Sequence, residues 1–163
     1  MFIEEGKYLE ALELIKELTY EPPNMFEVRS GNRIVDIQLS SFLNKIGMTI
    51  DDLNVQMSLD PDIEKISSRD LSIILGNLFD NIAYYADTTR NKSIEITIIY
   101  TREKFIVKTK NLIDTDKNRN SIRTSQHFGL GQELIREVIR KYNGEFITDK
   151  QDKFFSSYLI IFF

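Results

Sequence analysis

The sequence contains no cysteine and only one histidine among its 163 residues. Without cysteine there can be no disulfide framework and no thiolate metal site. A single histidine argues against a histidine-based metal centre or proton relay. No apolar run is long enough to cross a membrane, and the first residues lack the basic-then-apolar order of a signal peptide. These absences lead us to expect a soluble chain.

The charge balance argues against nucleic acids as partners. The net charge is −4, so the chain has no strongly basic surface of the kind that binds nucleic acid. The apolar content of 42% and the charged content of 28% are ordinary for a globular protein. The length suffices for one domain with a sizeable core. We therefore expect one soluble domain that has no nucleic-acid partner.

The apolar spacing divides the chain into a lone helix and an α/β body. Residues 3–19 carry an apolar stripe at three- and four-residue spacing, which predicts an amphipathic helix. Pro22 and Pro23 end it and begin a connector over residues 22–31. In the body we predict helices over residues 33–45, 67–85 and 130–142, and strands over residues 53–59, 93–101, 104–111, 145–148 and 154–163.

Two asparagines stand out within the second helix of the body. Asn77 and Asn81 are four residues apart, so they share one helix face beside the apolar stripe. Two amides at the edge of a core can close a polar pocket, and their neutral carbonyl oxygens suit a magnesium ion that keeps several waters. The alternative is that each asparagine only hydrogen-bonds nearby backbone.

A glycine-containing segment stands directly before the last predicted helix. Gly129 and Gly131 would let the backbone approach an anion, and free N–H groups at a helix start favour negative charge. The segment therefore has the form of a phosphate cradle, although an ordinary glycine-containing loop has the same composition. His127 lies just before it, where a lone histidine is more often a polar surface residue than a catalyst.

Tyr85 and the long polar segment before the glycines complete the set of candidates. Tyr85 ends the apolar stripe, where it can pack in the core or form an aromatic wall for a purine ring. Residues 112–126 are polar and have no period, and a loop of this length in a compact domain is usually functional or mobile.

Taken in order, these motifs resemble the ATP-binding catalytic domain of sensor histidine kinases, within the gyrase, chaperone, histidine-kinase and mismatch-repair (GHKL, or HATPase) class. The segment Asn-Leu-Phe-Asp-Asn at residues 77–81 is similar to the Asn-Leu-Leu-Asp-Asn-Ala motif of the quorum-sensing, peptide-pheromone branch. Residues 4–11 resemble the end of that branch's dimerisation helices, and residues 30–36 resemble the entry to its catalytic domain. The resemblance covers nearly the whole chain.

The resemblance implies a fold and a domain organisation. The fold would be an α/β two-layer sandwich with helices on one face of a mixed β-sheet, preceded by one amphipathic helix. Residues 1–21 would be the C-terminal part of a dimerisation helix and residues 22–31 a connector. Residues 32–163 would be the ATP-binding domain, with a lid at about residues 112–128.

The resemblance also implies roles for individual residues. Asn81 would hold Mg²⁺, and Asn77 would assist at the metal or its waters. Tyr85 would lie beside adenine, and Asn111 would accept a hydrogen bond from its amino group. The residues that would contact the lid or the phosphates are His127, Gly129, Leu130 and Gly131.

The chain departs from the family pattern at three places. Asn111-Leu112-Ile113-Asp114 stands where the family usually has Asp-x-Gly-x-Gly, so the charge and the glycine flexibility are lost. Gln132 replaces a leucine after the second glycine, and Tyr84 replaces a lysine or glutamate. These changes concern residues that would surround the nucleotide.

The implied function is transfer of the γ-phosphoryl group of ATP to a histidine on a dimerisation helix. That acceptor histidine is absent here, because the one histidine lies in the lid segment; we therefore expect no autophosphorylation by the isolated chain. The implied partners are ATP, the protein's own dimerisation domain and a response regulator, in a membrane-anchored homodimer whose catalytic domain is cytoplasmic. The alternatives are a nucleotide-binding switch of the same fold without kinase activity, such as an anti-sigma-type module, and a degenerate interaction domain that binds no nucleotide.

Overall fold

The computed structural model describes residues 26–47, 50–88, 92–113 and 126–163. The described helices are α2 (Arg33–Ile46), α3 (Ser68–Thr88) and α5 (Gln126–Lys141). The described strands are β1 (Asp52–Leu59), β2 (Ser93–Tyr100), β3 (Lys104–Leu112), β4 (Glu145–Gln151) and β5 (Phe154–Phe162).

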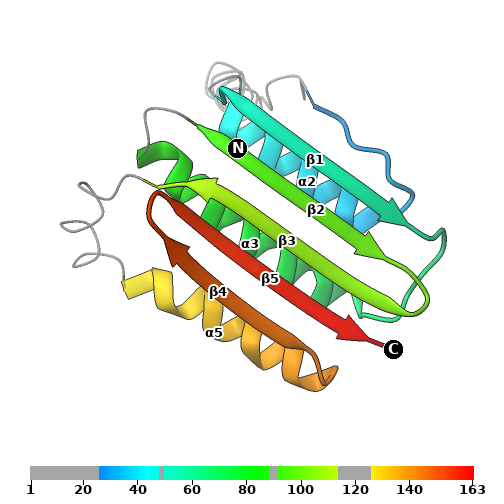
Figure 1. Cartoon of the computed structure of the whole chain (residues 1–163). Coiled ribbons are helices and arrows are strands. Elements are labelled where there is room, and N and C mark those ends of the chain that lie inside the picture. The colour runs from blue at the N-terminus through cyan, green and yellow to red at the C-terminus, as the bar shows by residue number, and fades with distance from the viewer. Residues whose placement is uncertain (1–25, 48–49, 89–91, 114–125) are drawn as a thin grey trace, which may run out of the picture.

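The five strands form one mixed sheet, and the three helices lie on one of its faces (Figure 1). The strand order is β1-β2-β3-β5-β4; β1 pairs with β2 in parallel, and all other pairs are antiparallel. No described segment covers the opposite face of the sheet. The predicted two-layer α/β sandwich is confirmed.

The core lies between the sheet and the helices, with α3 at its centre. Alternate residues of β2 are buried under the helices, from Ile94 to Tyr100, as a half-covered strand requires. Helix α3 is flanked by α2 and α5, which explains why it buries more than one stripe; the rings of Phe42 on α2 and Phe79 on α3 stack at 5.0 Å. Burying one such large apolar side chain stabilises the fold by about 1.5–3 kcal/mol.

Polar side chains fix the starts of two helices. The side chain of Asn32 accepts hydrogen bonds from the N–H groups of Ile34 and Val35 and so caps α2. Oγ of Ser67 accepts from the N–H of Asp70 at 3.1 Å, so Ser67 caps α3. The cap at Ser67 fixes where α3 begins, and therefore which of its residues lie beside α5.

The predicted body elements are all present, but the start of α5 was predicted wrongly. The helix begins at Gln126 instead of Leu130, so Gly129 and Gly131 lie inside its first turns and do not precede it. The apolar period begins only near Leu130, and glycine is a poor helix former, which hid the polar first turn from the pattern. The structure also places both ends of the expected lid in regular elements, because Leu112 belongs to β3 and residues 126–128 belong to α5.

Other expectations fall outside the described residues. The predicted helix over residues 3–19, the first part of the connector and residues 114–125 of the expected lid are among them. Among the described helices, none combines the length and apolar character needed to span a bilayer.

Candidate functional site

The two asparagines of α3 lie on its side toward the interior. Asn77 is half-buried, and its Nδ2 donates a hydrogen bond to the carbonyl oxygen of Ile73 at 2.7 Å. Asn81 is only 8% exposed, and its Nδ2 has no hydrogen-bond partner among the described residues. A buried amide without a partner costs about 1–3 kcal/mol, so Asn81 is a site at which a ligand or water is expected.

The glycine segment of α5 meets the asparagine helix directly. A Cβ atom added at Gly131 would lie 2.8 Å from Oδ1 of Asn77, so close that the Asn77 side chain would have to shift. Glycine at this position therefore allows α5 to approach α3 closely. Asn77 and Gly131, distant in the sequence, form one contact at the crossing of the two helices.

The helical start at Gln126 changes which N–H groups can meet an anion. The N–H groups of the first three residues of an α-helix have no partner within the helix, and here these are residues 126–128. The N–H groups of Leu130 and Gly131 fall within the hydrogen-bonded part. No acidic residue stands in the first turn, so the positive end of the helix dipole is not neutralised there.

The other residues of this segment are placed as follows. A Cβ atom at Gly129 would meet nothing within 4 Å, and Leu130 is 54% exposed. His127 lies in the first turn of α5, and its side chain is outside the described part of the structure. The first turn of α5, which has no acidic residue, thus comes directly before Gly131, the residue that meets Asn77.

Tyr85 belongs to a small aromatic cluster at the end of α3. Its ring lies 5.1 Å from the ring of Phe155 on β5 and 5.7 Å from that of Tyr84, and Ile113 completes the cluster. Burial, with a smaller contribution from Tyr84, raises the pKa of Tyr85 to about 12. The side chain is thus a neutral aromatic surface at physiological pH, one helical turn beyond Asn81.

Asn111 lies at the end of β3 on the face toward the helices. It is 1% exposed, and its strand partners are Ile94 on β2 and Phe155 on β5. Its Nδ2 donates to the carbonyl oxygen of Leu112 at 3.1 Å, whereas its Oδ1 has no partner among the described residues. Phe155 connects the two halves of the site, because it neighbours Asn111 in the sheet and packs against Tyr85.

Sequence reasoning nominated Asn111 and Tyr85 but not Phe155, which the structure places next to both. No local pattern marks Phe155, since it is one of several aromatic residues in an apolar strand. Its importance follows only from the register of β3 and β5, which sequence spacing does not specify. The same register brings Asn111 next to an aromatic wall.

The described residues offer no conventional metal centre. No group of three or more histidine, cysteine, aspartate or glutamate side chains among them could hold a metal ion. A cation at this site would have to rely on amide oxygens, waters and the ligand's own oxygens, which magnesium accepts. Asn81 is the buried amide available for that role.

A polar cluster fixes the relative position of α3 and α5. The carboxylate of Asp70 on α3 accepts hydrogen bonds from the hydroxyl of Tyr142 at 2.8 Å and from Nζ of Lys141 at 3.1 Å. Burial by itself would raise the pKa of Asp70, but these bonds, the hydrogen bond with Ser67 and the charge of Lys141 outweigh it and hold the pKa below its ordinary value. The cluster joins the start of α3 to the end of α5, the two helices that meet at Asn77 and Gly131.

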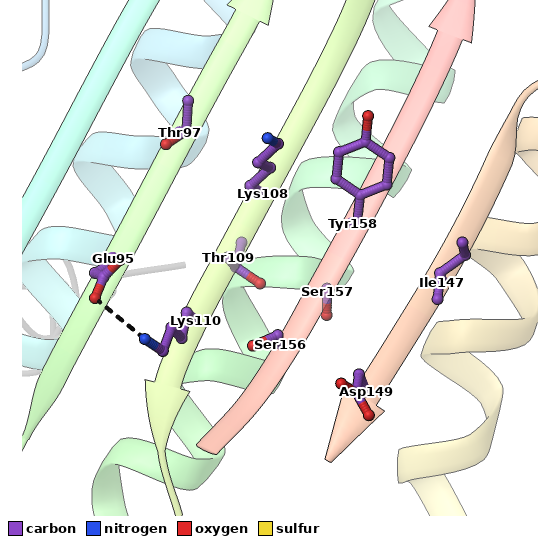
Figure 2. Close-up of a pocket in the computed structure, with 10 residues that line it drawn as sticks. All are labelled: Glu95, Thr97, Lys108, Thr109, Lys110, Ile147, Asp149, Ser156, Ser157 and Tyr158. Carbon is purple, nitrogen blue, oxygen red and sulfur yellow. Dashed lines mark ion pairs between the residues drawn. The ribbon is translucent and has the colours of Figure 1, made fainter. Parts of the chain in front are cut away.

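A separate hollow lies on the open face of the sheet (Figure 2). Its volume is about 340 Å³, and its lining includes Lys108, Lys110 and Tyr158. The Lys110–Glu95 ion pair across it spans 3.7 Å between half-exposed side chains, so it contributes little to stability. The sheet separates this hollow from the asparagines, and it is not part of the candidate site.

Comparisons with known proteins give a consistent result. A family model described as a GHKL domain matches residues 66–162, which is more than half of the chain. A comparison of the sequence with curated proteins finds no match.

Solved structures with similar folds include three histidine kinases. The catalytic domain of histidine kinase ThkA is 20% identical with a TM-score of 0.58, and the alignment covers 83% of this chain and 93% of that one. The Acinetobacter baumannii histidine kinase AdeS is 16% identical with a TM-score of 0.57, covering 96% and 76%. The mycobacterial sensor histidine kinase MprB is 14% identical with a TM-score of 0.55, covering 79% and 93%. At sequence identities of 14–20%, these alignments show that the fold is similar and no more.

Proposed function

Because the chain belongs to the GHKL domain family, we propose that it is the ATP-binding catalytic domain of a two-component sensor histidine kinase. It transfers the γ-phosphoryl group of ATP to a histidine on a dimerisation helix. The observation that carries the proposal is the meeting of α3 and α5 at Asn77 and Gly131, with the unpaired amide of Asn81 one turn farther along α3.

The residues present fit a magnesium–nucleotide complex. The unpaired Nδ2 of Asn81 is a buried donor that an oxygen of the ligand or of a metal-bound water would satisfy. The carbonyl oxygen of Asn81 would hold Mg²⁺, and Asn77 would assist at the metal's waters. Bound Mg²⁺ would neutralise charge that develops on the phosphates. The start of α5, which contains His127 and Gly129, would receive phosphate oxygens, with Leu130 beside it, and Gly131 allows α5 to approach α3 closely.

Other residues would bind the base of the nucleotide. Tyr85 and Phe155 present aromatic surface for the base, and Asn111 offers an unpaired buried acceptor between them and β2. In this mechanism the protein's contribution is positioning and charge stabilisation, as in other phosphoryl transfers.

The finer assignments rest on the sequence resemblance. We propose that the kinase is of the quorum-sensing, peptide-pheromone type, that residues 1–21 are the end of its dimerisation helix, and that residues 22–31 connect this helix to the catalytic domain. The full protein would be a membrane-anchored homodimer with this domain in the cytoplasm, and a response regulator would receive the phosphoryl group.

One observation favours a second candidate, a GHKL-fold switch or interaction domain without kinase activity. Asn111 stands where the family has an aspartate, so the charged contact to the base is lost. A domain that had ceased to bind nucleotide would tolerate this loss.

Calorimetric titration with Mg-ATP separates these candidates. We expect binding by the wild-type chain and at least a tenfold weaker affinity for Asn81→Ala, since a charge-assisted contact contributes about 1.5–3 kcal/mol. The control is Asn54→Ala, an exposed asparagine on β1, which should bind like wild type. Absence of binding by the wild type would support the interaction domain, and equal binding by Asn81→Ala would exclude its role at the metal.

Phosphoryl transfer is tested with γ-labelled ATP, magnesium and a separate helical hairpin that carries an acceptor histidine. Label on the hairpin alone is the expected result. Binding of Mg-ATP without transfer to any such hairpin would favour the switch. Stable, acid-labile label on His127 would overturn the role given to this segment.

A further inference from the structure

We propose that residues 3–19 of this chain dock as an amphipathic helix on the open face of the β-sheet, over a band of isoleucines on β2, β3 and β5. The contact would add a third layer to the sandwich, on the side of the sheet opposite α3 and α5 (Figure 1). Docking does not require nucleotide binding, because the candidate site lies on the other side of the sheet.

Three isoleucines form a continuous apolar band on the open face. Ile106 pairs with Ile99 on β2 and with Ile160 on β5. The strand neighbours of all three belong to the core under the helices, so by alternation the isoleucines point the other way. Ile106 is only 8% exposed, yet it belongs to neither core cluster of the described residues. A sheet face that meets only water is normally polar, so this band calls for a covering partner.

Exposed apolar side chains extend the band in two directions. Phe162, two residues beyond Ile160 on β5, is 69% exposed. Ile147 on β4 is 55% exposed and pairs with Tyr158, and Figure 2 shows both side chains on this face. Contiguous exposed apolar surface of this kind marks an interaction site.

The band has the dimensions of one helix. Neighbouring strands lie about 4.8 Å apart, so three strands span about 10 Å, which is close to the diameter of an α-helix. A helix over residues 3–19 would be about 25 Å long, and the nine residues of β5 extend over about 30 Å.

The connection is long enough to bring the segment to this face. The backbone of Phe26 exchanges hydrogen bonds with the side chain of Asn44 on α2, a helix that lies beneath β1 and β2 in Figure 1. From there the chain must pass around the edge at β1, across two layers of about 10 Å each. Residues 20–25 can span about 20 Å when extended, so they reach.

The charges of the segment and of the face are complementary. Residues 1–25 hold six glutamates and two lysines and thus carry the whole net charge of −4. On the open face, Lys104 and Lys108 flank Ile106 along β3, and neither forms an ion pair with another described residue. Glu145, opposite Ile160, lies at the β4 side of the band, so the segment's glutamates should lie over β3.

The tether favours this segment over a second copy of the chain as the occupant. A lone amphipathic helix is marginal in water and needs a surface for its apolar stripe. A short linker gives the tethered segment an effective concentration of about millimolar, far above that of a second molecule in a dilute sample.

Docking would compete with dimerisation. The segment has one apolar stripe, so the stripe cannot cover the sheet and pair with another helix at the same time. This consequence, unlike the docking itself, rests on the proposed function, which makes residues 1–21 the end of a dimerisation helix.

Because the chain has no cysteine, introduced pairs of cysteines test the contact without background. In the full chain, Ile15→Cys is combined with Ile160→Cys on the open face or with Ile37→Cys, a 51% exposed position on α2. A parallel series uses Leu12→Cys on the same stripe, since a disulfide requires close Cα atoms. Under mild oxidation the open-face pair should form an intramolecular disulfide at least about tenfold faster than the α2 pair. Leu18→Glu, which puts a charge into the stripe, should abolish this advantage.

A charge reversal tests the electrostatic part of the contact. Lys108→Glu should slow the open-face disulfide about two- to fivefold, and this effect should shrink at high salt. The matched control is Lys153→Glu, an exposed lysine between β4 and β5, which should keep the original rate. Urea unfolding checks that each variant is folded; if Ile160→Cys is not, Tyr158→Cys at the next outward position of β5 takes its place.

The outcomes separate this inference from the proposed function. Equal rates for the open-face and α2 pairs in both series would overturn the docking. Disulfide-linked dimers in place of intramolecular disulfides would assign the face to a second copy and also overturn it. Calorimetry with Mg-ATP should give the same affinity for wild type and Lys108→Glu, and absence of binding by both would overturn the proposed function while leaving the docking result unchanged.

Discussion

The contact between Gly131 and Asn77 predicts that Gly131→Ala will destabilise the wild-type fold but stabilise the fold of the Asn77→Ala variant. Replacing a glycine by alanine inside a helix normally stabilises it by about 1 kcal/mol. At Gly131 the new Cβ would lie 2.8 Å from Oδ1 of Asn77, so the amide must move and lose its 2.7 Å bond to Ile73. Such overpacking costs about 1–3 kcal/mol, and we expect Gly131→Ala to destabilise the fold by about 1 kcal/mol net.

Removing the amide should reverse the sign. In Asn77→Ala the remaining Cβ of residue 77 would lie 3.7 Å from the new methyl group, an ordinary contact. Gly131→Ala should then stabilise this background by about 1 kcal/mol, for a coupling of about 2 kcal/mol between the two positions. Gly129→Ala is the matched control, since a Cβ there would meet nothing within 4 Å and should stabilise both backgrounds alike.

Thermal and urea unfolding of wild type, Gly131→Ala, Asn77→Ala and the double variant measure this coupling. For a domain of this size about 1 kcal/mol corresponds to a change in Tm of about 2–4 °C. Effects of Gly131→Ala that agree within about 0.5 kcal/mol in the two backgrounds would refute the contact. The meeting of α3 and α5, on which the proposed function depends, would then need revision.

Two further predictions concern stability. Gly144→Ala should cost about 3 kcal/mol in urea unfolding, because its Cβ would lie 2.6 Å from the backbone oxygen of Ile160, which cannot rotate away; a loss below about 1 kcal/mol would contradict this packing. The lowered pKa of Asp70 stabilises the fold above the unfolded value of about 3.9, and this contribution is lost as the pH falls from there through the folded pKa. Asp70→Asn should therefore have a lower Tm than wild type at pH 7, and the difference between the two Tm values should shrink at pH 3. Equal pH profiles for wild type and Asp70→Asn would exclude the linkage.

Much of the fold could be predicted from sequence because its elements alternate between two clear periods. Strands β2 and β5 alternate between buried and more exposed residues, and α3 carries buried apolar residues from Leu71 to Ala86. The start of α5 could not be predicted in this way. Its first turn has no apolar period, and the need for glycine at residue 131 comes from the close approach of Asn77, a residue far away in the sequence.

The candidate site shows the same division between local and long-range information. The i, i+4 spacing of Asn77 and Asn81 and the two nearby glycines are visible in the sequence. The unpaired oxygen of Asn111 is not visible, because it results from strand register, from burial under α3 and from the hydrogen bond to Leu112. Site residues can be nominated from spacing, but which of their atoms remain available to a ligand depends on the tertiary structure.

The order of strands in the sheet has a consequence for synthesis of the protein on the ribosome. β5, the last of these five strands to be made, lies between β3 and β4, so β4 has no partner among them until Phe154–Phe162 has emerged. Until then one side of β3 also remains an open edge, and exposed edges invite pairing with other chains. The pairing of β3 with β5 is non-local and therefore slow to form, so the nascent chain would pass through an aggregation-prone interval that ends only when β5 inserts.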